Sequence, residues 1–282
     1  MFECVINISE GVNVSVIRKL ALVAGNSLCD IHVDKIHNRS VLTLVDADIL
    51  QPVKMVTKLA VESIDISRHQ GLHPRFGAVD VVPFVPFTKG SITKQDLTPA
   101  QRLRDDFIKW AKEELGLACM PYGSELSLPQ VRKILKDPVQ NIKRHQTAGV
   151  TCVGARQLLL AYNLYIGRGN GERAAFIAKQ IRARDVRSLG FCLQGEDQVS
   201  CNIVDLESCG PQEVYEKVSQ YANVTKTELV GLIPLGLFER TDPTYLDKLD
   251  ISYEKTIEYR LSLDEKERHE KILSILEKQI SP

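Results

Sequence analysis

Along the first third of the chain, the pattern of hydrophobic and polar positions alternates between short runs typical of strands and the spacing typical of helices. Four short runs rich in apolar and β-branched residues predict strands, at residues 2–7, 28–34, 40–46 and 79–85. Between them, apolar side chains recur at helical spacing in two segments, one around residues 17–24 and one that follows Pro52 and continues to Ile64. The predicted order of elements is β-α-β-β-α-β.

Pro83 lies inside the last of these runs. Because proline has no backbone N–H to donate, it is mostly confined to edge strands and bulges. We therefore predict that residues 79–85 form an edge strand or a bulged one. The pattern then predicts a long helix from Thr98 to Gly116, a strand at 118–122, a short helix that begins at Ser127, and a polar, basic loop at 137–149.

The second half of the chain repeats the same order. Strands are predicted at 158–166, 187–193, 199–206 and 227–232, and helices at 174–183 and from Pro211 onward, followed by a charged helical tail at about 243–280. In such a unit two helices pack on one face of a sheet. We predict an α/β (α+β) fold with two tandem subdomains, residues 1–157 and 158–282, each with helices packed on a mixed sheet. A cleft between subdomains would be a common place for a ligand.

Composition and charge argue against some classes of binding partner. The 282 residues include 36 basic and 36 acidic side chains, so net charge offers no general attraction to nucleic acid or to an anionic membrane. No apolar run approaches the roughly 18 residues of a membrane span, and the N-terminus lacks the pattern of a signal peptide. Seven dispersed cysteines without CxxC pairs are typical of reduced thiols. We expect a cytoplasmic protein that binds neither nucleic acid nor membrane.

The stretch HQGLHPRFGAVDVVPF at residues 69–84 concentrates reactive side chains. His69 and His73 are four apart, a spacing that binds metal on a helix, but Gly71 and Pro74 argue against a helix here. We therefore expect no metal site. Histidine is the side chain most easily poised near neutral pH for proton transfer, and Pro74 would restrict the backbone at His73.

Charged residues flank these histidines. Arg68 and Arg75 carry permanent positive charge suited to carboxylates, and Asp80 could orient an imidazole ring or pair with an arginine. A purely structural role is an equal alternative, in which His73 hydrogen-bonds the loop backbone and Asp80 pairs with Arg75. The residues alone leave both alternatives open.

Two further stretches have a similar character. The segment 34–40, DKIHNRS, places Asp34, Asn38 and Arg39 at a connection between strands, where a polar hairpin is at least as good an interpretation. The segment 147–156, TAGVTCVGAR, has small residues that would let the backbone approach a ligand closely, but it has neither a dinucleotide-binding context nor a Walker lysine.

These residues carry a resemblance to a known family. INISEG, VDKIHNRSVLTLVD, DISRHQGLHPRFGAVDVVPFVP, AGVTCVGARQLLLAYN, QVSCNIVD and ELVGLIPL occur in the order found in the formiminotransferase family. The most specific motif is HPRFGAVDVVPF. The resemblance spans nearly the whole chain and concerns the transferase region alone, without the cyclodeaminase module.

The resemblance implies a fold, a reaction and a site. Family members have two α/β subdomains, usually in a homodimer, and bind tetrahydrofolate as co-substrate, often polyglutamylated, in an electropositive tunnel between the subdomains. They move the formimino group of N-formimino-L-glutamate to N5 of tetrahydrofolate in histidine degradation, a one-carbon reaction that requires neither metal nor nicotinamide. By the same resemblance His73 is the catalytic general base and acid, and Asp34 is the nearest match to the acidic residue that assists it. The residues expected to bind glutamate or folate are Asn7, Asn38, Arg39, Arg68, Arg75, Gly149, Gly154 and Arg156.

Two stretches depart from the family pattern. Residues 124–149 lack the Asp-Phe-Gly-Pro-like segment of the folate region, and residues 183–190 are shorter than usual. Two alternatives therefore stand beside formimino transfer. One is glutamate-dependent transfer of the formyl group of 5-formyltetrahydrofolate, and the other is a non-catalytic folate-binding protein.

Overall fold

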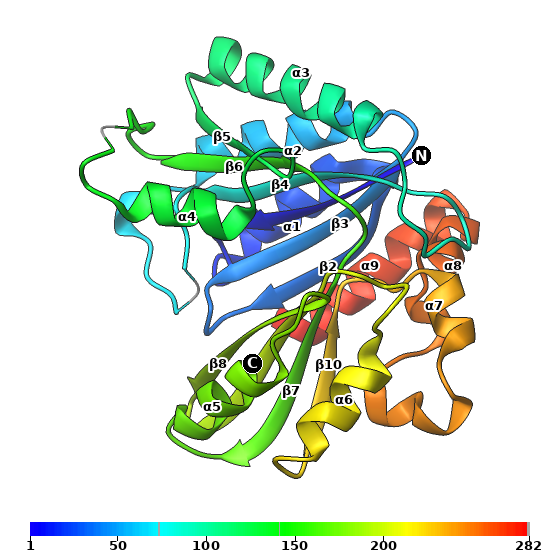
Figure 1. Cartoon of the computed structure of the whole chain (residues 1–282). Helices are drawn as coiled ribbons and strands as arrows, with labels where there is room; N and C mark the ends of the chain where they lie inside the picture. The colour runs from blue at the N-terminus through cyan, green and yellow to red at the C-terminus, as the bar shows by residue number, and fades with distance from the viewer. Residues whose placement is uncertain (73, 141, 281–282) are drawn as a thin grey trace. The chain divides into compact units, whose positions relative to one another are not determined.

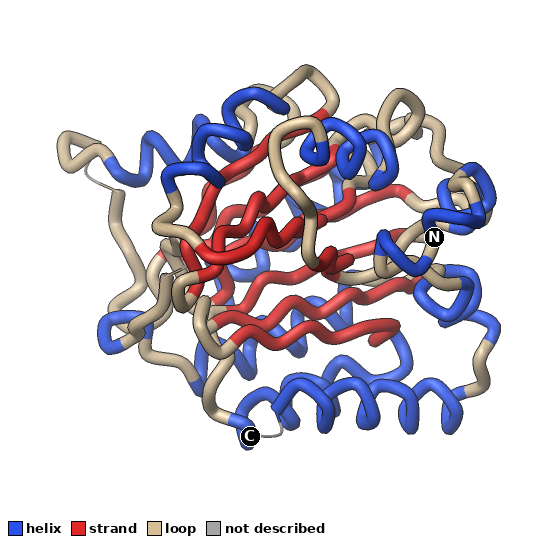
Figure 2. The backbone as a smooth tube through the Cα atoms, turned by 90° about the horizontal axis from the view of Figure 1, so that it is seen from below, coloured by secondary structure: helices blue, strands red, loops and turns tan. Residues whose placement is uncertain are grey.

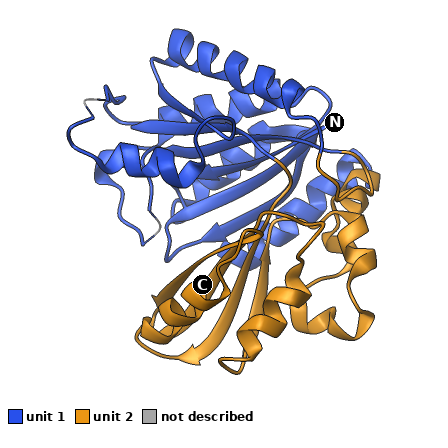
Figure 3. Cartoon of the chain, viewed as in Figure 1, with its two compact units in different colours: residues 1–87, 95–156, 263–282 blue, residues 88–94, 157–262 orange. Residues whose placement is uncertain are grey.

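The computed structural model of the chain describes residues 1–72, 74–140 and 142–280. The chain forms two compact units, which are coloured separately in Figure 3. Unit 1 comprises residues 1–87, 95–156 and 263–282, and unit 2 comprises residues 88–94 and 157–262. The units are thus discontinuous along the chain, and the division into domains 1–157 and 158–282 stays a prediction.

Unit 1 contains a six-stranded mixed sheet in the order β2-β3-β1-β4-β6-β5 (Figure 1). Its elements in chain order are β1 (Phe2–Ile8), α1 (Val14–Ala24), η1 (Gly25–Ser27), β2 (Leu28–Asp34), β3 (Arg39–Asp46), α2 (Leu50–Ser63), η2 (Ile66–Arg68), β4 (Val79–Pro86), α3 (Thr98–Leu115), β5 (Ala118–Tyr122), α4 (Leu128–Lys136), β6 (Val150–Ala155) and α9 (Glu265–Ile280). The pairs β4–β6 and β5–β6 are parallel and the others antiparallel. The predicted β-α-β-β-α-β order is confirmed.

Unit 2 contains a four-stranded sheet in the order β10-β7-β9-β8, whose pairs are all antiparallel. Its elements are β7 (Leu160–Arg168), α5 (Glu172–Ile181), β8 (Val186–Leu193), β9 (Glu196–Ile203), α6 (Pro211–Ser219), β10 (Lys226–Val230), α7 (Leu235–Arg240), η3 (Pro243–Tyr245), η4 (Asp247–Leu249), η5 (Tyr253–Lys255) and α8 (Ile257–Ser262). The second β-α-β-β-α-β order and the predicted α/β class with two tandem subdomains are confirmed. The prediction of a mixed sheet holds for unit 1 but was wrong for unit 2, whose described strands pair only in antiparallel fashion.

One face of the unit 1 sheet forms the main core. Alternate residues of β1, such as Ile6 and Ile8, are fully buried there against apolar side chains of α1, α2 and α3. The helix α9 runs alongside the strands and adds Ile272 and Leu276 to this core (Figure 2). The opposite face is partly covered by α4. Across the described ranges, no helix combines the length and the apolar character that a membrane crossing requires.

The prediction of an edge position for the strand that contains Pro83 was wrong. β4 lies between β1 and β6, and Pro83 pairs with Gly154 of the parallel neighbour. The pairing of β4 with β1 is irregular, but the register shift falls beside Val79 and Val81. A residue directs its N–H toward only one neighbouring strand, so a central proline costs one hydrogen bond, which the buried apolar side chains of β4 offset.

Candidate functional site

The loop at 69–78 packs against the turn between β2 and β3. His69 donates its Nε2–H to the carbonyl oxygen of Asn38 at 2.9 Å, and Asn38 donates its side-chain amide to the carbonyl of Gln70 at 2.7 Å. The N–H of Leu72 donates to the carbonyl of Ile36 at 3.4 Å. The residues that precede His73 are therefore held by a fixed turn, while His73 itself lies outside the described residues.

Asn38 joins three segments at this point. It adopts a φ of 48°, in the left-handed region that asparagine tolerates, and its Oδ1 accepts the N–H of Gly11 at 2.8 Å. Gly71 approaches the same turn so closely that a Cβ there would overlap the carbonyl oxygen of His37. Asn38 therefore supports the loop through its own side chain.

Asp34 stabilises the turn between β2 and β3 through its side chain. Its Oδ1 accepts the backbone N–H groups of Ile36 and His37, both at 2.8 Å, while its Oδ2 lies 3.9 Å from Nε2 of His37. Asparagine and aspartate commonly hold turns in this way. The carboxylate that sequence comparison selected is thus placed in the turn that contacts the loop.

Several predicted residues share one face of the sheet. Asn7 is opposite Val41 in the β1–β3 register, and Asp34 is opposite Arg39 in the β2–β3 register. Because side chains alternate along a strand, Asn7, Asp34 and Arg39 lie on the face away from α1, α2 and α3. Gly154 lies on this face of β6, and Arg156 follows the end of that strand.

Arg75 of the loop and Arg68, which ends η2 just before it, differ in surroundings. Arg75 donates from its Nη1 to the carbonyl of Gly71 at 2.8 Å and from its Nη2 to the carbonyl of His69 at 2.7 Å. Burial lowers the pKa of Arg75, although the charge of Asp80 opposes this shift. Arg68 has a side chain that is 88% exposed, with its Nε 3.4 Å from the carboxylate of Asp65. Arg75 therefore stabilises the loop through hydrogen bonds to its backbone, whereas Arg68 is a surface residue.

Asp80 anchors the loop where it enters β4. Its Oδ1 accepts the N–H of Phe76 at 2.7 Å, and its Oδ2 forms an ion pair with Arg132 of α4 at 2.6 Å. Burial raises the pKa of Asp80, while Arg132 and the N–H of Phe76 act in the opposite direction. The sequence interpretation offered Arg75 as the ion-pair partner and missed Arg132. The only local signal was that Arg132 adjoins the apolar position Val131.

A cavity of about 660 Å³ opens beside this loop. It is lined by Ile66, Gly71, Leu72, Pro74, Arg75, Phe76, Arg144, His145, Gln146 and Gly149. Gly149 adopts a φ of 70°, and a Cβ there would overlap the carbonyl oxygen of Phe76, so glycine lets the two walls meet. Of the predicted residues that the structure describes, Arg75 and Gly149 line the cavity. Arg144 and His145 were not selected from sequence, although KRHQ precedes TAG directly.

Arg156 belongs to a separate buried cluster. Its positive charge acts on the carboxyl group of Glu3, whose pKa burial nevertheless raises to about 7. Burial likewise raises the pKa of Tyr122 to about 12, against the influence of Arg156. The Tyr122 ring lies over Gly154, where an added Cβ would overlap it. The space next to Gly154 is therefore filled by a side chain.

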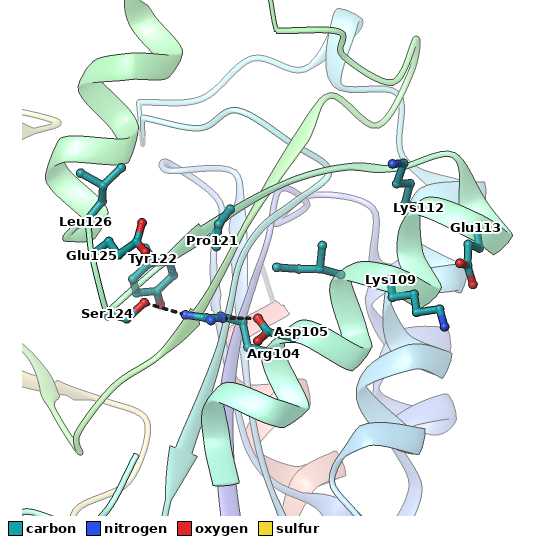
Figure 4. A pocket seen from close by; sticks show the side chains of 11 residues that line it. Arg104, Asp105, Lys109, Lys112, Glu113, Pro121, Tyr122, Ser124, Glu125 and Leu126 are labelled. Atoms are coloured by element: carbon teal, nitrogen blue, oxygen red, sulfur yellow. Dashed lines mark hydrogen bonds and ion pairs between the residues drawn. The ribbon is translucent and has the colours of Figure 1, made fainter. Parts of the chain in front are cut away.

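A second cavity of about 620 Å³ lies between α3 and residues 121–126 (Figure 4). Arg104 crosses its edge and donates to Asp105 at 2.8 Å and to Ser124 Oγ at 3.0 Å. None of the predicted site residues that the structure describes lines it. The cavity beside the 69–78 loop is therefore the better candidate site. Within the described ranges, no three His, Cys, Asp or Glu side chains gather as a metal site would require, and independence from metal stays a prediction.

Comparison with known proteins decides the family. Residues 1–156 match the N-terminal subdomain of the formiminotransferase domain, and residues 161–268 match the formiminotransferase domain. The chain belongs to the formiminotransferase family. The resemblance seen in the sequence is confirmed, and so is the expectation of an enzyme of the transferase class.

Named relatives cover most of the chain. A glutamate formimidoyltransferase of Streptococcus pyogenes serotype M1 is 34% identical in an alignment of 292 positions, and the alignment covers 90% of this chain and 96% of the relative. A glutamate formimidoyltransferase of Thermoplasma acidophilum is 31% identical, over 83% of this chain and 88% of the relative. A formimidoyltransferase-cyclodeaminase of Sus scrofa is 32% identical, over 88% of this chain and 53% of that longer protein.

Proposed function

We propose that this family member transfers the formimino group from N-formimino-L-glutamate to N5 of tetrahydrofolate. The observation that carries the proposal is the similarity to a protein named glutamate formimidoyltransferase over 90% of this chain and 96% of the relative. The cationic cavity beside the H-P-R loop supports it, since both substrates carry carboxylates.

His73 is the proposed general base and acid. N5 of tetrahydrofolate attacks the formimino carbon, and the attacking nitrogen loses a proton as the tetrahedral intermediate forms. The departing glutamate nitrogen must gain a proton, so one histidine can serve both steps in turn. Asp34 would stabilise the cationic amidine or the imidazolium, and holding both substrates together supplies much of the rate gain.

The surroundings of His69 support the choice of His73. The Nε2–H of His69 donates to the carbonyl of Asn38. Burial lowers the pKa of His69, and the charge of Arg75 lowers it further. A ring held in this way is suited to bracing the loop more than to exchanging protons with a substrate.

Carboxylate binding is proposed for arginines near the loop and on the sheet face away from α1, α2 and α3. Arg75 lines the cavity, while Arg39, Arg68 and Arg156 are the further candidates for the carboxylates of glutamate or of a polyglutamylated folate tail. Asn7, Asn38, Gly149 and Gly154 complete the proposed binding set. No metal takes part in this proposal.

The proposed setting is a cytoplasmic homodimer that acts in histidine degradation. All seven cysteines lie in the described part of the chain, and none there forms a disulfide bond. Thiols in this state fit a reducing compartment.

An activity assay tests the proposal. Wild-type protein, a His73→Ala variant and a His269→Ala control are incubated with tetrahydrofolate and N-formimino-L-glutamate; His269 is an exposed residue of α9. We expect turnover by wild type and control, and a loss of at least about 100-fold in kcat for His73→Ala because general acid–base catalysis is removed. Full activity of His73→Ala would refute the base assignment.

Parallel assays separate the alternatives. Turnover of 5-formyltetrahydrofolate with glutamate, and none with N-formimino-L-glutamate, would establish formyl transfer instead. Tight binding of tetrahydrofolate without turnover of either donor would establish a folate-binding protein.

A further inference from the structure

His145 is held in one orientation by the backbone that follows it. Its Nδ1 accepts the N–H of Ala148 at 3.0 Å and the N–H of Thr147 at 3.3 Å. An imidazole nitrogen that accepts hydrogen bonds has no proton, so the proton of the neutral ring lies on Nε2. The ring therefore presents a donor on the side away from this turn.

The segment that carries His145 is itself braced. The backbone N–H and C=O of His145 bond the C=O and N–H of Gly149 at 2.9 and 3.0 Å. Further backbone hydrogen bonds join this segment to the 69–78 loop and the start of β4. Val150 donates to the carbonyl of Phe76 at 2.9 Å, and Ala78 donates to the carbonyl of Ala148 at 2.9 Å. The position of the ring is thus coupled to the 69–78 loop through backbone hydrogen bonds.

The donor side of the ring is available to a ligand. No described residue forms a hydrogen bond with Nε2 of His145, and this residue lines the cavity together with Arg75 and Arg144. A fixed neutral donor in a cavity that two arginines also line matches a carboxylate, which accepts hydrogen bonds and carries negative charge. The preorganised frame lowers the entropy cost of this contact.

We propose that His145 binds a carboxylate of the glutamate part of the donor substrate through its Nε2–H, in the cavity beside the 69–78 loop. This inference rests on the proposed formimino transfer. It assigns His145 a role in substrate recognition that is separate from proton transfer at His73.

Two substitutions distinguish the role of Nδ1 of His145, which accepts from the turn, from the role of Nε2, which donates. In His145→Asn, the side-chain oxygen can still accept the N–H groups of residues 147 and 148, as asparagine does in turns, but no donor reaches the cavity. In His145→Gln, a longer amide reaches toward the cavity, but its oxygen is displaced from the turn. Lys143→Ala is the matched control because Lys143 is an exposed basic residue of the same segment.

We expect His145→Asn to keep the wild-type melting temperature and to raise KM for N-formimino-L-glutamate about 10-fold or more, since it loses a hydrogen bond to a charged group. Its kcat and its KM for tetrahydrofolate should be unchanged. His145→Gln should melt at a lower temperature and raise this KM less. Lys143→Ala should have the melting temperature and the KM for N-formimino-L-glutamate of the wild type.

Titration calorimetry with N-formimino-L-glutamate distinguishes failure of this inference from failure of the proposed function. Weaker binding by His145→Asn supports the inference even if wild type shows no turnover, which would refute formimino transfer alone. Wild-type KM and affinity in His145→Asn would overturn the inference and leave formimino transfer standing. A wild-type protein that neither binds nor turns over this substrate would overturn both.

Discussion

Glu3 of β1 is a carboxyl group with only 3% of its surface exposed. Burial raises its pKa to about 7, although the positive charge of Arg156 acts in the opposite direction. Its Oε2 accepts no hydrogen bond from any described residue. The ionised form of Glu3 is therefore disfavoured in the folded chain relative to the unfolded chain.

This residue predicts a pH dependence of stability. Below pH 4.5 the carboxyl is protonated in both states; as the pH rises from 4.5 to about 7, the unfolded chain ionises first and the free energy of unfolding falls. The loss amounts to about 3 kcal/mol and is complete above pH 7. Glu3→Gln removes it, so the stability of this variant relative to wild type should rise by about 3 kcal/mol over that range.

Urea unfolding at several pH values measures the difference. Glu62→Gln is the control because Glu62 is exposed on α2, and its difference from wild type should stay flat. A difference for Glu3→Gln that does not change with pH would show that Glu3 ionises alike in both states.

At the scale of elements, α4 connects the two walls of the candidate site. Ser127 and Gln130 form a capping box at its N-terminus, and Val131 and Leu135 pack it against the sheet. Arg132 reaches Asp80 at the entry of β4, and Leu135 accepts a hydrogen bond from Arg144 at 2.7 Å. The helix thus braces both the loop and the segment before Gly149.

Removing the charge of Arg132 should loosen this brace. Arg132→Met leaves the carboxylate of Asp80, whose side chain is 3% exposed, without its ion-pair partner. We expect a loss of about 3 kcal/mol in the free energy of unfolding, together with a lower kcat/KM. Lys133→Met, at the next and exposed position of the same helix, should change stability by less than about 0.5 kcal/mol. Urea unfolding of both variants checks this, and equal stabilities would contradict the anchoring role.

At the scale of the whole chain, the last helix completes the first unit. β2 is an edge strand, and Gln279 of α9 accepts the N–H of Val33 at 2.6 Å and donates to the carbonyl of Ile31 at 3.3 Å. Covering exposed backbone groups in this way protects a sheet edge from pairing with other chains. Unit 1 therefore depends on residues more than 100 positions away from its other segments.

Paired leucines on α9 test this dependence. Leu276 is fully buried, whereas Leu273 is 36% exposed. Leu276→Ala should lower the stability of unit 1 by about 3 kcal/mol, and Leu273→Ala by much less. Trp110, the single tryptophan, packs against the unit 1 core, so its fluorescence during urea unfolding reports on this unit. Equal midpoints for the two variants would mean that α9 contributes little to unit 1.

Local patterns were sufficient for the elements of the two β-α-β-β-α-β units and their order, but β6 (Val150–Ala155) was not predicted. Apolar periodicity located the strands and helices of both β-α-β-β-α-β units, and Gly116, with a φ of 59°, ends α3 at the predicted residue. These features depend on neighbours within a turn or a strand, so a short stretch of sequence contains their cause. The H-P-R motif likewise indicates the family through residues that are contiguous in the chain.

Only packing between distant segments decided the rest. Asp80 forms its ion pair with Arg132, 52 positions away, rather than with the nearby Arg75, and β4 became central despite Pro83. Nothing in the local pattern showed that His145 would line the same cavity as Arg75 or that α9 would cover β2. Such contacts form when buried surfaces of separate segments meet, and their partners are selected by the fit of the whole core rather than by spacing along the chain.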